Sequence, residues 1–506
     1  MSQPSQKLSF VEKAGYSCAD AAANFVFMTM VCFQANFYTD VFGITAVAAG
    51  GIILVARLWD AFFDPLMGVL ADRTNTRWGK FRPWILFSAV PWCVVMYLAY
   101  TTPSGWGSTA KVVYALATNI LLMTIYSANN MPYAALGGVM TGNIDERAKL
   151  NSYRFIAVNA AQFIVVGITL PLVYKFGGPE HNRQHGWSMT MGLYAVLCLF
   201  LFLITFATSR ERIHPPPLQK TPPKRDFADL LGNGPWKVMF AVTFLHFTML
   251  AFQGSAQYNY IHSYANKAAL FDWLNSLGLT GPPLADGAPQ PGGILEFLRF
   301  IVHGDRASLE NSNVADVGYS IISMIGKVVT ILVILASPSL SRALGKKAVA
   351  VGGFALSAIA YLVFYAIQPA NVGGIVLMTI LTSAVYAPTI PLLWAMFADV
   401  ADYSEWKNGR RATGMIFATI CFALKAGLSL GSASFLWLMA MYGYSANAPQ
   451  TPRTLEGMHM CYTVFICVLF AICTALLALY QISKRLNLQI ANELAERRLK
   501  AGAPPA

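Results

Sequence analysis

The sequence predicts an all-α membrane protein with twelve transmembrane helices arranged in two pseudo-symmetric six-helix bundles. Of its 506 residues, 56% are hydrophobic and only 12% are charged, about half the charged share of a soluble protein. The apolar residues are gathered in many runs of about 18 to 28 residues, each long enough to cross a hydrocarbon core about 30 Å thick. These runs are too long for the strands of a transmembrane barrel, which span about ten alternating residues.

The polar breaks between the apolar runs give the expected limits of the helices. In the first half we expect helices at about 16–40, 45–71, 84–102, 110–138, 151–174 and 187–209, and in the second half at about 236–263, 315–341, 347–368, 372–400, 412–441 and 456–483. Between the two sets lies a stretch rich in proline that cannot continue a helix. We therefore expect an N-terminal bundle over 1–210, a cytoplasmic linker over 211–234, a C-terminal bundle over 235–483 and a cytoplasmic tail over 484–506.

The basic residues of the short loops predict the orientation. Lysine and arginine gather in the loops after helices 2, 4, 8, 10 and 12 and are scarce in the alternate loops, and such loops are kept in the cytoplasm. Both termini should therefore be cytoplasmic, and the net charge of +12 reflects orientation and not a nucleic-acid partner. The insertion at about 266–316 should then lie outside, either as an ordered cap or as a flexible segment.

A faint internal repeat supports two halves. The segment Gly68-Val-Leu-Ala-Asp72-Arg73, followed by Gly79-Lys80, comes after the second helix, and the related segment 340–347 comes after the eighth. Two halves that repeat in parallel are typical of secondary transporters, which hold their substrate at the midplane between the halves. The first of these patterns is also typical of the major facilitator superfamily.

Ionisable residues inside a membrane span are costly and are therefore candidates for function. Asp60 and Asp64 are four residues apart, which places both carboxylates on one face of the second helix. Such a pair can hold a monovalent cation, or can share a proton at neutral pH. The structural alternative is that the two carboxylates pair with Arg57 and Arg154.

Amide and hydroxyl groups gather on three other predicted helices, where they can bind a hydroxyl-rich ligand or join helices by hydrogen bonds. These residues are Asn24, Tyr126, Ser127, Asn129, Asn130, Gln253 and Gln257, together with the carboxylate of Asp20. Arg154 and Lys425 are taken as the only strongly basic groups deep in their spans, so each should meet a carboxylate or a ligand. His246 is interpreted as a packed polar residue and not as a proton carrier.

Several motifs occur in order at helix-consistent spacing. They are Tyr38-Thr-Asp40, Ala56-Arg-Leu-Trp-Asp60 with Asp64-Pro65, Arg77-Trp-Gly-Lys-Phe-Arg-Pro83, Glu146-Arg147 with Tyr153-Arg154, and Asp399-x-x-Asp402-Tyr-x-Glu405-Trp-Lys407 with Gly409-x-Arg411-Ala-x-Gly414. Together, over about residues 8 to 485, the chain resembles the glycoside-pentoside-hexuronide:cation symporters of the major facilitator superfamily, the family that includes the melibiose permease.

The resemblance implies a function and assigns roles to residues. It implies import of a sugar across a bacterial inner membrane by alternating access, coupled to H⁺ or Na⁺, with no other cofactor, no enzymatic activity and a monomer in membrane lipid as the working unit. It assigns the cation site to Asp60, Asp64, Ser127 and Lys425. It assigns sugar-binding positions to Asn24, Tyr126, Asn130 and Arg154, to which we add Asp20, Asn129, Gln253 and Gln257.

Three departures from the melibiose permease refine the expectation. Phe63 stands where that protein has an amide near the cation, which favours H⁺ over Na⁺. Asn24 and Asn130 replace carboxylates that grip sugar hydroxyls, and Ala134 replaces a stacking tryptophan. A neutral glycoside or oligosaccharide is therefore expected first and a hexuronide second, with Asp20 close enough to neutralise Arg154.

The charged loop clusters predict a cytoplasmic gate. We expect ion pairs that close the inner side while the carrier faces out, from Asp72, Arg73, Asp399, Asp402, Glu405 and Arg411. Three rivals to a sugar symporter are a carrier of lysophospholipids or other amphiphiles, a membrane enzyme acting on lipid-linked sugars, and a nutrient sensor. The amide-rich helices argue against a purely apolar cavity, and no catalytic carboxylate or histidine pair accompanies a donor-binding motif.

Overall fold

The computed structural model describes residues 7–141, 144–178, 182–212, 230–282, 293–303, 306, 309, 312–408, 413–446 and 448–500. Over these residues the chain is almost wholly helical. Eleven helices are long and apolar enough to cross a membrane, and the count is twelve if the bent first pair forms one span. The predicted all-α membrane fold with twelve spans is therefore confirmed.

The six helices of the first bundle lie close to their expected positions. They are α1 (Phe10–Cys32) with its continuations α2 (Gln34–Asn36) and the π-helix η1 (Phe37–Val41), α3 (Ala46–Arg73), α4 (Arg82–Ala99), α5 (Ser108–Met140), α6 (Ile144–Phe176) and α7 (Arg183–Thr208). The first span bends by 60° between Cys32 and Gln34. Within the bundle, α1 packs on α6 and α7, α4 packs on α5 and α7, and α3 packs on α5.

The second bundle repeats this plan with more breaks. Its spans are α9 (Gly234–Asn259) with η2 (Tyr260–Tyr264), α12 (Val314–Ile334), α14 (Lys346–Tyr365), α15 (Val372–Tyr386) with α16 (Thr389–Asn408), α17 (Thr413–Met441), and α18 (Pro452–Met460) with η3 (Cys461–Phe465) and α19 (Ile466–Ala478). The short helix α13 (Ser337–Leu344) follows α12, and α20 (Lys484–Lys500) follows the last span. The break between α15 and α16 falls at Pro388, which has no backbone N–H for the helix ladder.

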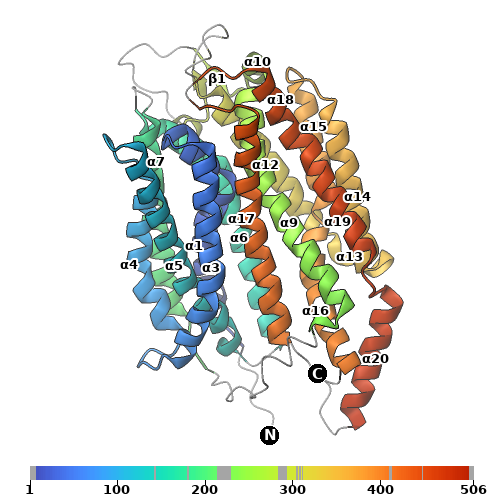
Figure 1. Ribbon diagram of the computed structural model, residues 1–506. Coiled ribbons are helices and arrows are strands. Elements are labelled where there is room, and N and C mark those ends of the chain that lie inside the picture. The colour runs from blue at the N-terminus through green and yellow to red at the C-terminus, as the bar shows by residue number, and fades with distance from the viewer. Residues whose placement is uncertain are drawn as a thin grey trace.

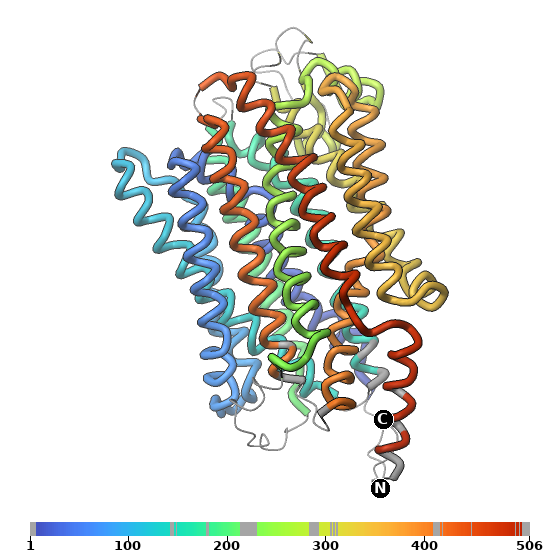
Figure 2. Tube along the Cα trace, turned by 45° about the vertical axis from the view of Figure 1, so that its right-hand side comes forward, coloured from blue at the N-terminus to red at the C-terminus, as the bar shows by residue number. Residues whose placement is uncertain are grey.

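Both termini lie at the same end of the molecule, as Figure 1 shows, and the helix α10 (Lys267–Ser276) lies at the opposite end. Most of the predicted linker, residues 213–229, is outside the described residues. The two bundles stand side by side, with α17 of the second against α3 of the first, and the tube in Figure 2 follows the long helices from one end of the molecule to the other.

The described part of the insertion at 266–316 contains short helices and a pair of short strands. After α10, the strand β1 (Thr280–Gly281) pairs in parallel with β2 (Val302–His303), and the short helix α11 (Ile294–Phe297) lies between them in sequence. An ion pair of 2.8 Å joins Arg306 to Asp272. An ordered cap over the outer side stays a prediction, because residues 283–292 lie outside the described residues.

The basic loop before α4 is fixed by a carboxylate from the end of α7. Glu211 accepts hydrogen bonds of 2.8 to 3.0 Å from the backbone N–H groups of residues 80, 81 and 82, which would otherwise be unpaired donors at the start of α4. Gly79 has a φ of +108°, and a Cβ there would lie 2.4 Å from the Glu211 carboxylate. Glycine is therefore required at this turn.

Candidate functional site

The predicted cation-site residues converge at the interface between the bundles. Asp60 and Asp64 lie one turn apart on α3, and Asp60 is only 4% exposed. The Ser127 hydroxyl on α5 contacts the Asp60 carboxylate and lies 2.6 Å from that of Asp64. The Lys425 ammonium on α17 lies 2.7 Å from Asp60 and also contacts Asp64.

This cluster joins the two halves of the chain, because α3 and α5 belong to the first bundle and α17 to the second. The structural alternative, pairing of the two carboxylates with Arg57 and Arg154, is not what the described residues show. Arg57 is buried, and its Nε and Nη2 atoms have no hydrogen-bond partner among the described residues. Arg154 pairs elsewhere, with Asp20 at 3.0 Å.

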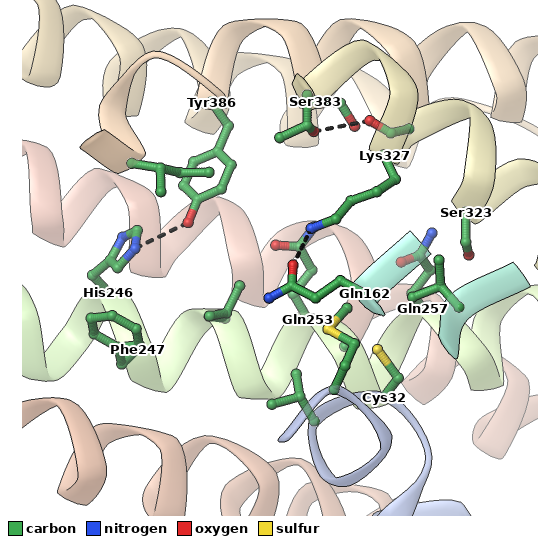
Figure 3. A pocket seen from close by; sticks show the side chains of 18 of the residues that line it. Cys32, Gln162, His246, Phe247, Gln253, Gln257, Ser323, Lys327, Ser383 and Tyr386 are labelled. Carbon is green, nitrogen blue, oxygen red and sulfur yellow. Dashed lines mark hydrogen bonds between the residues drawn. The ribbon is translucent and has the colours of Figure 1, made fainter. Parts of the chain in front are cut away.

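Beside the cluster, a cavity of about 460 Å³ lies between the bundles, a volume within the range of small-molecule sites. Four of the eight predicted substrate residues line it: Asn24, Tyr126, Gln253 and Gln257. Other polar or aromatic residues of the lining are Gln162, His246, Ser323, Lys327, Ser383, Tyr386 and Trp394. Figure 3 shows amide, hydroxyl and ammonium groups from both bundles around one space.

The cavity wall and the charged cluster share two helices. Tyr126 lines the cavity and is followed on α5 by Ser127, and Leu424 lines it and is followed on α17 by Lys425. Tyr126 is held by a stack on Trp92 with the ring centroids 5.4 Å apart. The charged cluster and the cavity wall therefore adjoin each other along α5 and α17.

Lys327 corrects the sequence analysis, which took Arg154 and Lys425 as the only strongly basic groups deep in their spans. Lys327 lies on α12, lines the cavity, and donates a hydrogen bond to the side-chain oxygen of Gln162 on α6. The Gln162 amide in turn donates to Asn24 on α1 at 2.8 Å. Sequence reasoning missed both residues, although a lone lysine inside an apolar run was a visible signal.

The remaining predicted substrate residues are not among those that line this cavity. Asp20 and Arg154 form their ion pair outside it, with the guanidinium 5.4 Å from the centre of the Tyr133 ring. Asn129 is 1% exposed and donates to Ser88 on α4 at 2.8 Å. Asn130 is half-buried on α5. Their assignment to the substrate stays a prediction.

His246 lies at the far side of the cavity. It is 3% exposed, its Nε2 is 3.0 Å from the Tyr386 hydroxyl, and its ring stacks on Phe354 with the centroids 5.6 Å apart. These contacts agree with the interpretation of His246 as a packed polar residue.

Polar and aromatic contacts close the bundle interface at the end opposite the termini. Arg183 on α7 pairs with Asp316 on α12 at 2.9 Å. The Tyr444 hydroxyl donates to the Asp40 carboxylate, and Phe33 packs edge-on against Tyr319 with centroids 5.5 Å apart. All three contacts join the first bundle to the second, so they hold the two bundles together at that end.

The predicted gate residues that the structure describes lie at the other end. Asp399 pairs with Lys346 at 2.7 Å within the second bundle. Asp72 and Arg73 are exposed at the end of α3. Asp402 and Glu405 lie on α16, and Arg411 is outside the described residues. A gate made of these groups stays a prediction for a conformation closed at this end.

Comparison with known proteins assigns the family. The sequence model of the family described as MFS/sugar transport protein matches residues 15–285 and 312–484. The inner membrane symporter YicJ of Escherichia coli strain K12 is 31% identical over 92% of this chain and 91% of its own length. The isoprimeverose transporter of Lactiplantibacillus pentosus is 30% identical over 94% of this chain and 89% of its own length.

Solved structures agree with the fold. The crystal structure of the nucleoside transporter NupG has a TM-score of 0.59 at 14% identity, covering 94% of this chain and all of that one. That of the D-xylose-proton symporter has a TM-score of 0.53 at 13% identity, covering 90% and 95%. The chain belongs to the MFS/sugar transport protein family, of the glycoside-pentoside-hexuronide type, and is a multi-span membrane transporter.

Proposed function

We propose that this transporter is a proton-coupled symporter that imports a sugar across the bacterial inner membrane by alternating access. The observation that carries the proposal is the cross-bundle cluster of Asp60, Asp64 and Lys425 beside a sugar-sized cavity. The names of the relatives, a symporter and an isoprimeverose transporter, support sugar as the substrate. The amide and hydroxyl lining of the cavity disfavours an amphiphile carrier.

The cluster couples a cation to the motion of the bundles. Lys425 compensates two carboxylates of the opposite bundle, so it holds α17 against α3. A cation that binds to the carboxylates takes over part of the compensation that the Lys425 charge supplies. It also repels Lys425, because like charges near one site repel, and the ion pair between the bundles becomes weaker. Loading of the cation thus changes the contacts that decide whether the bundles can rock, while the sugar occupies the adjoining cavity.

The oxygen set of the cluster favours a proton as this cation. A hydroxyl carries one hydrogen, so Ser127 can donate to only one of its two carboxylate partners at a time. A proton on one carboxyl completes the hydrogen bonds between the three side chains. Phe63, which the family resemblance places near the cation, stacks on Trp59 with centroids 5.9 Å apart and offers no oxygen.

The basic loops support an orientation with the termini in the cytoplasm. In that orientation the contacts of Arg183 with Asp316 and of Asp40 with Tyr444 join the bundles at the outer end, as expected of a carrier that faces inward.

Transport by the Asp64→Asn variant tests the proposal. In membrane vesicles, the variant should lose sugar accumulation driven by an imposed pH gradient and should retain sugar exchange at equal concentrations, because the cavity is untouched. Wild-type accumulation should collapse with a protonophore. Full uphill accumulation by the variant would overturn the assigned cation site, and a strict Na⁺ requirement that ignores the protonophore would overturn the choice of proton.

A further inference from the structure

Lys327 is the single charged side chain among the described residues that line the cavity. The lining contains amides, hydroxyls, aromatic rings and the buried His246, and no aspartate or glutamate is part of it. Figure 3 shows the Lys327 side chain reaching from α12 across the cavity to the side-chain oxygen of Gln162. The cavity therefore holds an uncompensated positive charge.

The contacts of Lys327 differ from those of three other cations that lie between helices. Lys425, Arg154 and Arg183 each meet at least one carboxylate. The printed contact of Lys327 is instead with the neutral amide oxygen of Gln162. An amide supplies a dipole and not a full charge, and a cation taken out of water is stabilised well only by an anion. The site is thus incomplete without an anionic partner.

A second donor faces the same space. Ser323 lies one turn before Lys327 on α12, so the two side chains share a helix face. Its hydroxyl is buried beside the Tyr319 hydroxyl, with which it forms a hydrogen bond. An ammonium and a hydroxyl that line one cavity from the same helix can both donate to a carboxylate.

We propose that Lys327, with Ser323, is a subsite for a singly charged anionic group on the substrate, and that the transported sugar is an acidic one with a carboxylate. This inference rests on the proposed function and names its substrate class. A single lysine matches one negative charge, whereas the described lining holds no second lysine or arginine for a dianionic phosphate. The amides of Asn24, Gln162 and Gln257 are left to bind the sugar hydroxyls.

The inference reverses the order of substrates expected from the sequence. That expectation placed neutral sugars first because Asp20 was near enough to neutralise Arg154, and the ion pair of 3.0 Å is present. Neutralising Arg154, however, leaves Lys327 unbalanced. An anionic sugar would also replace Gln162 as the partner of Lys327. The direct contact between α6 and α12 would then be lost, and the substrate would bridge the two helices instead.

Equilibrium binding of matched sugar pairs to the purified protein tests the subsite. Each pair is a methyl glycoside and its uronide, in the gluco and galacto series, with a 6-sulfo sugar as a second anion source. We expect at least one uronide to bind about tenfold or more tightly than its neutral partner, as the loss of a hydrogen bond to a charged group predicts. A sulfo sugar bound more tightly than the uronide would overturn the choice of carboxylate.

Three variants separate recognition of charge from folding. Lys327→Gln should lose the preference for the uronide and keep binding of the neutral sugar within about threefold, whereas Lys327→Arg should keep the preference. Lys237→Gln, which removes an exposed lysine at the start of α9, should bind as the wild type does. Equal loss of both sugars in Lys327→Gln would overturn the subsite.

Binding of the sugar pairs to the wild-type protein alone also tests the inference. Tighter binding of every neutral partner would overturn the inference, even if no variant folded. Proton-driven accumulation of those neutral sugars would then leave the proposed function standing. If no sugar of either class binds or accumulates, both the inference and the proposed function fail.

Discussion

Replacing Lys425 by glutamine should destabilise the protein strongly, and a second substitution should restore part of the loss. The ammonium lies 2.7 Å from Asp60, which at an effective dielectric constant of about 20 corresponds to an attraction of about 6 kcal/mol before desolvation is counted. Removing one partner of a buried pair typically costs about 3–5 kcal/mol, because the other charge is left uncompensated. Lys425→Gln strands two carboxylates, whereas Lys425→Gln with Asp64→Asn strands one.

The double variant should therefore be more stable than Lys425→Gln alone, by about 1–3 kcal/mol, the range of coupling between residues in contact. The assay is unfolding of the purified protein followed by tryptophan fluorescence for the wild type, both single variants and the double variant. Lys237→Gln serves as the control for loss of a lysine charge. Strictly additive effects, or a Lys425→Gln variant as stable as the wild type, would refute the ion pair as the link between the bundles.

Two further predictions concern the loops at the terminal end. Hydrogen bonds from Lys13 and Lys149 hold the pKa of Glu146 at about 2, below its usual 4.5. The stability that this group contributes is therefore present above about pH 4.5 and is lost as the pH falls toward 2. The difference in unfolding temperature between the wild type and Glu146→Gln should shrink across that window. An unchanged difference would contradict the assignment. Gly79→Ala should cost about 1–3 kcal/mol, because its φ of +108° and the Glu211 carboxylate exclude a Cβ. The control Gly68→Ala, where nothing lies within 4 Å, should be neutral or slightly stabilising.

The helices were predictable because the bilayer imposes their length and composition. The apolar runs gave spans close to α3 (Ala46–Arg73) and α7 (Arg183–Thr208). The bend in the first span was not predictable, since no proline marks it. The break before α16 had a visible cause in Pro388, but hydropathy alone does not distinguish a broken helix from a continuous one.

The sequence predicted which site residues share a face of one helix, because helical spacing determines that. It predicted less well which residues of different helices meet, because that depends on how the helices pack. Four-residue spacing put Asp60 and Asp64 on one face, but their meeting with Lys425 depends on how α3 and α17 pack and came only from the family resemblance. Residues 126 to 130 go round the helix by about 400° at 100° per residue, so the five side chains cannot all face one cavity. Tyr126 lines the cavity, whereas Asn129 donates to Ser88 on α4. Lys327 was overlooked because one charge scarcely changes the hydropathy of a 21-residue helix.

The most direct measurement of the central claim is proton movement when sugar enters. Weakly buffered, de-energised cells that carry the transporter are given substrate while the external pH is recorded. The account predicts that the medium turns alkaline as sugar enters through the wild-type protein, and that no such change occurs with Asp64→Asn. Sugar entry through the wild-type protein without any proton uptake would contradict it.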